Sequence, residues 1–181
     1  MARKQLFYLS LIVTVLSSIA LAAIGSPLTN PQTPWGILSF ELCAYGSSCT
    51  AIVHSWTGSV PLKAALSLGV DYLFMVAYSA TLFLGLLMMA DQVPPGLRPL
   101  TLGSAAAVWL VGTADALENY FLFHILVSPS NPQVAWAATL SATVKFVLLG
   151  LTLGWLAFTY LRYGPHRWLG KRKSVPYSPQ P

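Results

Sequence analysis

Residues 112–120, Gly-Thr-Ala-Asp-Ala-Leu-Glu-Asn-Tyr, lie inside an apolar segment, 100–127, that is long enough to cross a membrane. Asp115, Glu118 and Asn119 are three and four residues apart, so a helix places them on one face. A charged side chain near the bilayer centre costs about 2.5–3.5 kcal/mol, and such residues almost always face a bundle interior or a wet cavity. This face is therefore the candidate functional site.

The composition predicts a membrane protein. Of the 181 residues, 55% are hydrophobic and 8% are charged, whereas a soluble domain carries about 25% charged residues. The net charge of +5 does not indicate nucleic acid, because half of the basic residues follow the last apolar segment. We expect this C-terminal basic cluster to contact anionic lipid head groups of the bilayer; it consists of Arg162, Arg167, Lys171, Arg172 and Lys173.

The pattern of apolar runs predicts an all-α fold, a transmembrane four-helix bundle with an extra interfacial helix on its outer face. The predicted spans cover residues 6–24, 64–90, 100–127 and 134–161. They form a single transmembrane domain, 1–161, followed by a basic, proline-containing cytoplasmic tail, 162–181. The first span is either retained or removed as a signal peptide, because Ala20-Leu21-Ala22 resembles a cleavage site. In the fourth span, Gly150 and Gly154 predict close helix packing.

The predicted interfacial helix covers residues 36–55. It is too polar to span a membrane, and Trp35 and Trp56 flank it in the manner of interfacial anchors. Cys43 and Cys49 lie within it, and either a local disulfide or two free thiols fits their spacing. An oxidising compartment outside the cell would permit the disulfide.

Basic residues set the expected orientation, because Lys and Arg in short loops favour the cytoplasmic side. In a four-span protein Arg3, Lys4, Arg98 and the C-terminal basic cluster fall on one side, and Lys63 falls on the other. We therefore expect a multi-pass protein of the bacterial inner membrane with both termini in the cytoplasm.

Ionisable residues on three spans predict one ligand or ion-pair centre. Asp71, Asp115, Glu118 and Lys145 fall at similar depths, with Asn119 beside them. A purely structural ion pair that fixes helix register is one interpretation. One lysine cannot neutralise three acids, however, so either a carboxyl is protonated or water, a cation or a ligand reaches it. The candidate pocket-lining residues are Glu41, Tyr72 and Tyr78.

Other kinds of site lack a signature in the sequence. There is no convincing metal-ligand spacing, no cofactor motif and no catalytic motif, so we expect neither a metal nor a cofactor and assign no catalytic residue. Whether the centre catalyses a reaction is left open.

Four polar motifs carry a resemblance to other proteins. They are the segments 36–42 (Gly-Ile-Leu-Ser-Phe-Glu-Leu), 67–79 around Asp71 and Tyr78, 115–119 (Asp-Ala-Leu-Glu-Asn) and 144–146 (Val-Lys-Phe). From Trp35 to Leu161 the chain resembles a group of small bacterial four-span integral membrane proteins of unassigned function. The resemblance implies that Glu41, Asp71, Asp115, Glu118, Asn119 and Lys145 belong to one polar centre, and it implies no activity.

Three functional classes remain. The favoured one is a protein whose buried acidic centre binds a small amphipathic or lipid-like ligand. The second is an accessory structural subunit that binds a membrane protein partner. The third is a small proton- or cation-coupled transporter, although four spans without a repeat form a small pathway.

Overall fold

The computed structural model describes residues 2–46, 48–129 and 131–170. This described part is helical and contains no β-strand. The helices, in chain order, are α1 (Arg3–Gly25), η1 (Ser26–Leu28), α2 (Ile37–Glu41), α3 (Cys43–Gly46), α4 (Cys49–Ser55), α5 (Val60–Ala90), α6 (Arg98–Val127) and α7 (Pro132–Gly170).

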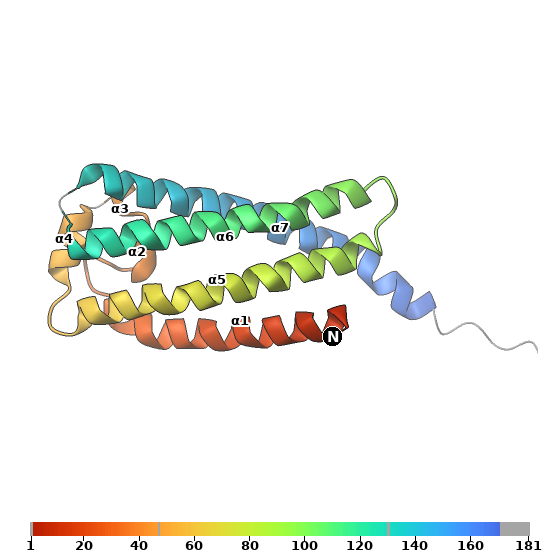
Figure 1. Cartoon of the computed structure of the whole chain (residues 1–181), viewed down its shortest axis with the longest axis horizontal. Helices are drawn as coiled ribbons and strands as arrows, with labels where there is room; N and C mark the ends of the chain where they lie inside the picture. The colour runs from red at the N-terminus through yellow and green to blue at the C-terminus, as the bar shows by residue number, and fades with distance from the viewer. Residues whose placement is uncertain (1, 47, 130, 171–181) are drawn as a thin grey trace, which may run out of the picture.

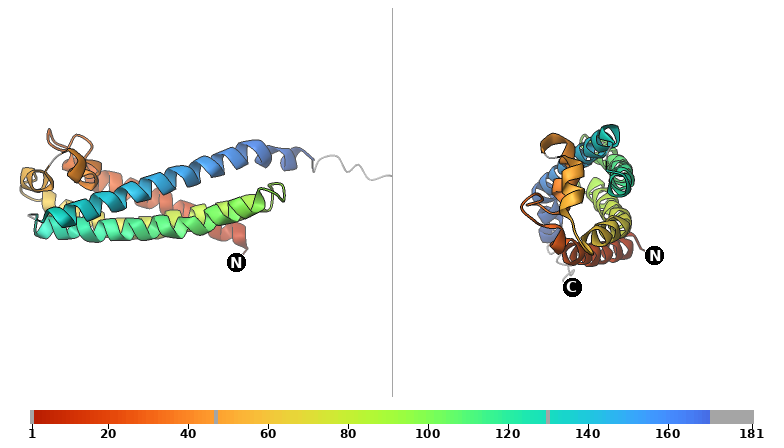
Figure 2. Two further views of the ribbon diagram at one scale, coloured as in Figure 1. Left: turned by 90° about the horizontal axis from the view of Figure 1, so that it is seen from above. Right: turned by 90° about the vertical axis from the view of Figure 1, so that its left-hand side faces the viewer.

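Four of these helices, α1, α5, α6 and α7, are long and apolar enough to cross a membrane. They pack in chain order, α1 on α5, α5 on α6 and α6 on α7, with a smaller contact between α5 and α7 (Figures 1 and 2). The predicted segments 6–24, 64–90, 100–127 and 134–161 each lie within one of these helices. Their length and composition thus indicate a membrane protein.

The last helix is longer than the predicted fourth span. The backbone of α7 continues to Gly170, so the first part of the predicted tail is helical. The basic residues Lys171, Arg172 and Lys173, and the rest of the tail, lie outside the described residues.

Helix α1 is the most peripheral of the long helices. Ser17 is the single buried residue of this fully described helix. Thr14 contacts Thr81 of α5 through hydroxyl oxygens 3.2 Å apart. At the N-terminal end of α1, the Arg3 guanidinium lies 2.7 Å from the carboxylate of Asp91, the residue that follows α5. Helix α1 is therefore held mainly by α5.

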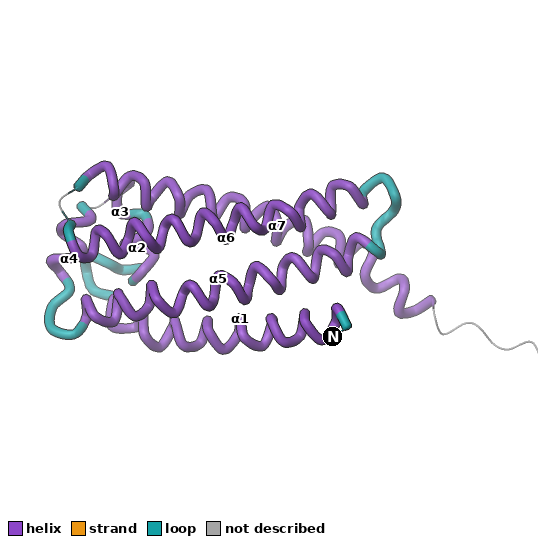
Figure 3. The backbone as a smooth tube through the Cα atoms, in the orientation of Figure 1, coloured by secondary structure: helices purple, strands orange, loops and turns teal. Residues whose placement is uncertain are grey.

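The segment from Ile37 to Ser55 forms three short helices rather than the one continuous interfacial helix that we predicted. Cys43 and Cys49 are joined by a disulfide with their Cα atoms 5.0 Å apart. A continuous helix would separate residues six positions apart by about 9 Å. The chain must therefore bend between them, and α2, α3 and α4 cover the end of the long helices opposite the N-terminus (Figures 1 and 3).

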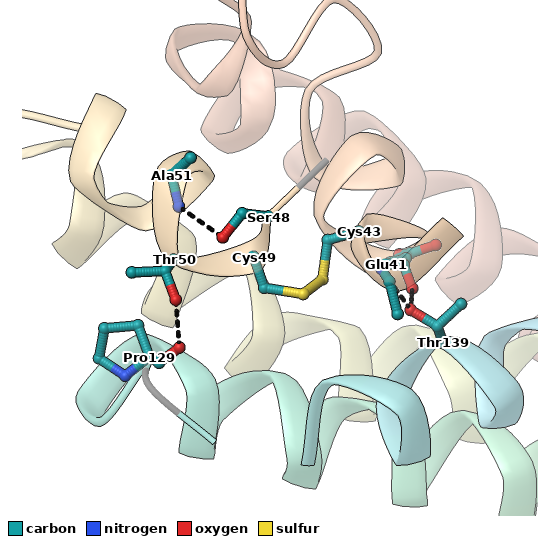
Figure 4. The surroundings of a disulfide bond; sticks show 9 residues. Glu41, Cys43, Ser48, Cys49, Thr50, Ala51, Pro129 and Thr139 are labelled. Carbon is teal, nitrogen blue, oxygen red and sulfur yellow. Dashed lines mark hydrogen bonds between the residues drawn. A yellow bond between two sulfur atoms is a disulfide. The ribbon is translucent and has the colours of Figure 1, made fainter. Parts of the chain in front are cut away.

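Side-chain hydrogen bonds attach these short helices to the long ones. The Thr139 hydroxyl of α7 donates to the Glu41 carbonyl at 3.0 Å and accepts from the Ala44 amide at 3.2 Å. The Thr50 hydroxyl donates to the Pro129 carbonyl at 2.6 Å, beside the disulfide (Figure 4). We call the disulfide-linked segment 37–55 the outer cap.

Gly36 sets the direction in which the outer cap begins. Its φ of +58° lies in the left-handed region, which residues with a Cβ rarely adopt. A Cβ at this position would also lie 3.2 Å from the Thr29 hydroxyl. Glycine therefore allows the chain to turn into α2, which ends at Glu41.

Two apolar clusters fill the interior. The first joins the outer cap to the adjacent ends of the long helices and includes Phe40, Ile52 and Leu122. The second lies farther along α5 and α6 and includes Leu86 and Val108. On α6, Asp115, Glu118 and Asn119 fall between the residues of the two clusters, so the polar centre separates them.

The predicted close packing at Gly150 and Gly154 is wrong. A Cβ added at either glycine would meet no described atom within 4 Å. Close packing occurs instead between α5 and α6, where a Cβ on Gly112 would lie 3.1 Å from the Ser79 hydroxyl.

The disulfide should stabilise the outer cap. A cross-link closing a loop this short removes about 2 kcal/mol of chain entropy from the unfolded state. A reducing agent should therefore lower the Tm of the wild-type protein in detergent. It should leave the Tm of a Cys43→Ala/Cys49→Ala variant unchanged, and an unchanged wild-type Tm with both thiols titrated as free would contradict the prediction.

Candidate functional site

Lys145 lies at the middle of the polar centre. Its Nζ atom is 2.6 Å from Glu118 Oε2, 3.2 Å from Asp115 Oδ1 and 3.7 Å from Glu41 Oε2. Lys145 is 7% exposed, and none of the three carboxyl residues exceeds 9%. The centre is thus a buried cation surrounded by three acids from two helices.

The local sequence explains how these groups meet. Asp115 and Glu118 share a face of α6 because they are three residues apart. Helix α7 packs along α6 and brings Lys145 to that face. Glu41 is the last residue of α2, and Thr139 of α7 holds its carbonyl. The outer cap therefore supplies one of the three carboxyl groups.

Three further side chains extend the centre across α5 and α6. The Tyr78 hydroxyl donates a hydrogen bond to Asp115 Oδ2 at 2.7 Å. The Asn119 amide donates to Asp71 Oδ2, also at 2.7 Å. Each bond supplies a donor to a carboxyl oxygen. Asp71 therefore belongs to the same polar network through Asn119.

The charges of this centre do not balance. The chain has five acidic residues; four of them, Glu41, Asp71, Asp115 and Glu118, lie here, and the fifth, Asp91, pairs with Arg3. With every group ionised, one lysine and four carboxylates would carry a net charge of −3. Such a charge is not tolerated in a membrane interior, so protons or a cation must offset it.

Glu41, outside the spans, shows one way to offset the charge. Burial raises the pKa of Glu41 above its ordinary value of 4.5; Lys145 lowers the pKa, and Asp115 raises it. The direction that prevails is upward, because removing a carboxylate from water disfavours its charged form. Glu41 therefore keeps its proton to a higher pH than an exposed glutamate does.

A metal ion does not fit this centre. Among the described residues, no three His, Cys, Asp or Glu side chains are placed to hold one. Lys145 occupies the position between the carboxyl groups that a metal would need.

A cavity of about 340 Å³ lies beside the centre. Its polar wall is formed by Glu41, Ser67, Asp71 and Asn119, which come from α2, α5 and α6. The rest of its lining comes from the C-terminal end of α1, from η1, from the segment before α2, and from Ile37 of α2 and Leu68 of α5, and it includes Leu21, Ala22 and Trp35. The volume is within the range of small-molecule sites, about 300–1,000 Å³.

The structure places the predicted site residues in two groups. Lys145, Asp115, Glu118 and Glu41 form the ion cluster, while Glu41, Asp71 and Asn119 line the cavity. The other two candidate lining residues, Tyr72 and Tyr78, lie outside the cavity wall. Tyr72 instead donates to the Ala116 carbonyl at 3.2 Å, and Tyr78 supports Asp115.

Sequence reasoning missed Ser67, Gly36 and Thr139. Ser67 precedes Asp71 by four residues, so helical spacing could have placed it on the Asp71 face. Gly36 and Thr139 gave no comparable signal, because their roles depend on how the outer cap folds back.

No protein-family model, curated protein or solved structure matches the chain.

Removing the central cation should destabilise the protein strongly. Lys145→Met leaves buried carboxyl groups without a counter-charge, and breaking a buried ion pair in this way costs about 3–5 kcal/mol. Adding Glu118→Gln to Lys145→Met should restore part of the loss. The measurement is Tm in detergent for the single and double variants.

Arg3→Met is the matched control, because the Arg3–Asp91 pair is about half exposed. Its cost should be about 0–1 kcal/mol. Equal losses in Arg3→Met and Lys145→Met would show that the buried cluster does not depend on its lysine.

The raised pKa of Glu41 predicts a pH effect. Above pH 4.5 the folded protein retains a proton at Glu41 that the unfolded chain releases, so stability falls as pH rises toward the pKa of the folded state. Glu41→Gln mimics the protonated form. The Tm of this variant should therefore decrease less than that of the wild type when the pH is raised from acidic to neutral. Ser39→Ala on the same helix should parallel the wild type; a parallel Glu41→Gln profile would refute the prediction.

Proposed function

We propose that this protein is an integral membrane protein that binds a small amphipathic ligand in the cavity beside the Lys145 cluster. The cavity carries the proposal. Its lining combines two carboxyl groups, an amide and a hydroxyl with apolar residues such as Leu21, Ile37 and Leu68. Ligand sites commonly combine an apolar lining with a few convergent polar groups.

The proposed setting is the bacterial inner membrane, in keeping with the resemblance to small bacterial membrane proteins. In this arrangement α1, α5, α6 and α7 form a four-helix bundle, and the outer cap lies at the extracytoplasmic surface. Support comes from the basic residues near the ends of the long helices that lie away from the outer cap, because Lys and Arg favour the cytoplasmic side. These residues are Arg3, Lys4, Arg98 and Arg162. Both termini are then cytoplasmic, and the basic tail can contact anionic lipids.

A purely structural ion pair accounts for less of the site. One carboxylate would be enough to neutralise Lys145, yet three acids lie around its ammonium group and a fourth lines the cavity. Each additional buried acid adds a desolvation cost. Ligand binding explains both the additional acids and the space beside them. No reaction is proposed, because binding alone accounts for this arrangement.

Native mass spectrometry of the protein extracted gently from its own membrane tests the proposal. We expect a reproducible small-molecule adduct on the wild type. Ala22→Phe should abolish this adduct, because Ala22 is an exposed residue of the cavity lining and a larger side chain there fills the space.

Ala23→Phe is the matched control, since Ala23 is also exposed on α1 but does not line the cavity. It should retain the adduct. A stable protein partner with no adduct would reject ligand binding and favour an accessory subunit. An adduct equally present in both variants would place the ligand elsewhere.

A further inference from the structure

We infer that the ligand's head group is a protonated amine, bound at the wall formed by Asp71, Glu41 and Ser67. This inference rests on the proposed function, because it names the chemical class that the same cavity selects. It is carried by the hydrogen-bonding groups that remain open at this wall and by their charge.

The open groups at the wall are acceptors. Asn119 donates to Asp71 Oδ2, and Asp71 Oδ1 accepts no hydrogen bond from any described residue. Glu41 also lines this wall and is 9% exposed, but its Oε2 atom lies 3.7 Å from the Lys145 Nζ atom. A ligand that binds at Asp71 Oδ1 must therefore donate a hydrogen bond, since a carboxylate can only accept one.

Ser67 adds a second, independent observation. Its side chain is 4% exposed and lines the cavity. Several other hydroxyls on these helices, such as those of Thr81 and Thr101, donate to a carbonyl four residues earlier. The Ser67 hydroxyl has no such bond or other partner among the described residues, so it is free to contact a ligand. A hydroxyl can both donate and accept a hydrogen bond, so Ser67 can pair with the head group of a ligand beside Asp71.

The charge of the neighbourhood selects a cation over a neutral donor. Lys145 contacts Glu118, Asp115 and Glu41 but gives no ion pair to Asp71. Asp71 therefore has an amide donor but no positive partner within the described residues. An ammonium group supplies both a positive charge and N–H donors, and charge-assisted hydrogen bonds are about twice as strong as neutral ones. An alcohol supplies a donor but leaves the excess negative charge in place.

The shape of the cavity favours an organic amine over a metal ion. No described group of three acidic, His or Cys side chains could hold a metal. The volume of about 340 Å³ far exceeds that of a bare ion. Leu21, Ile37 and Leu68 provide apolar lining next to the polar wall, and an alkyl chain can be buried against them. The matching ligand is an alkylammonium with its nitrogen at Asp71.

The test compares dodecylamine with dodecan-1-ol, which share a chain length and differ in the charge of the head group. Binding to the full-length protein in detergent is followed by native mass spectrometry and by the rise in Tm. We expect dodecylamine to bind at least about tenfold more tightly than dodecan-1-ol, a difference of about 1.4 kcal/mol. Asp71→Asn should remove that preference, because it keeps the shape of the side chain and removes its charge.

Two further variants distinguish binding at this wall from partition into the micelle. Ala22→Phe should abolish binding of both probes, and Ser67→Ala should weaken dodecylamine several-fold while preserving the fold. If Asp71→Asn does not fold, the Ser67→Ala result decides. Dodecylamine binding that neither Asp71→Asn nor Ser67→Ala weakens would overturn the inference.

The remaining outcomes separate this inference from the proposed function. Equal binding of both probes, abolished by Ala22→Phe, would overturn the amine assignment and retain an amphipath-binding cavity. If neither probe binds while the native adduct is lost in Ala22→Phe, the amine assignment is again overturned and the proposed function stands. Absence of both probe binding and a native adduct would overturn both.

Discussion

The ammonium group of Lys145 is the constraint on which the rest of the structure depends. Inside a membrane a lysine must be paired and an acid must be neutralised. Lys145 on α7 meets Glu118 and Asp115 on α6 and Glu41 on α2, and these contacts fix how the two long helices and the outer cap lie against each other. The two apolar clusters lie on either side of this polar centre, and apolar packing offers few directional contacts. The ion cluster thus fixes the relative positions of α6, α7 and the outer cap, which apolar packing alone would not determine.

The outer cap and the polar centre form one structural unit. Glu41 reaches Lys145 because Gly36 turns the chain into α2 and Thr139 holds the end of that helix. The Cys43–Cys49 disulfide then reverses the chain immediately beyond it. The same arrangement makes Glu41 part of both the ion cluster and the cavity wall. A change in the cap therefore alters the charge at Lys145 and the shape of the cavity together, although the cap lies outside the long helices.

Helical periodicity could predict the long helices and the acidic face, but not the outer cap. The three- and four-residue spacing of Asp115, Glu118 and Asn119 determines their shared face whatever the tertiary structure. The breaks near Leu42 and Gly46 depend on a disulfide whose formation the sequence left open. The tyrosines show the same limit: helical spacing puts Tyr78 on the Asp71 face, yet only packing decides that it bonds to Asp115 and leaves the cavity wall to Ser67. Gly150 and Gly154 had the right spacing for close packing, but they lie on an exposed face of α7.

Helix α1 contributes the most peripheral part of the cavity lining. Three walls, from α2, α5 and α6, are tied together by the ion cluster, by the Asn119–Asp71 hydrogen bond and by the apolar core. The fourth wall comes from α1, which has one buried residue and packs mainly on α5. The polar wall is thus firmly held, while part of the apolar lining, Leu21 and Ala22, belongs to the most peripheral of the long helices. An amphipathic molecule fits that asymmetry, because its head group requires fixed partners and its alkyl chain requires only a nonpolar surface continuous with the lipid.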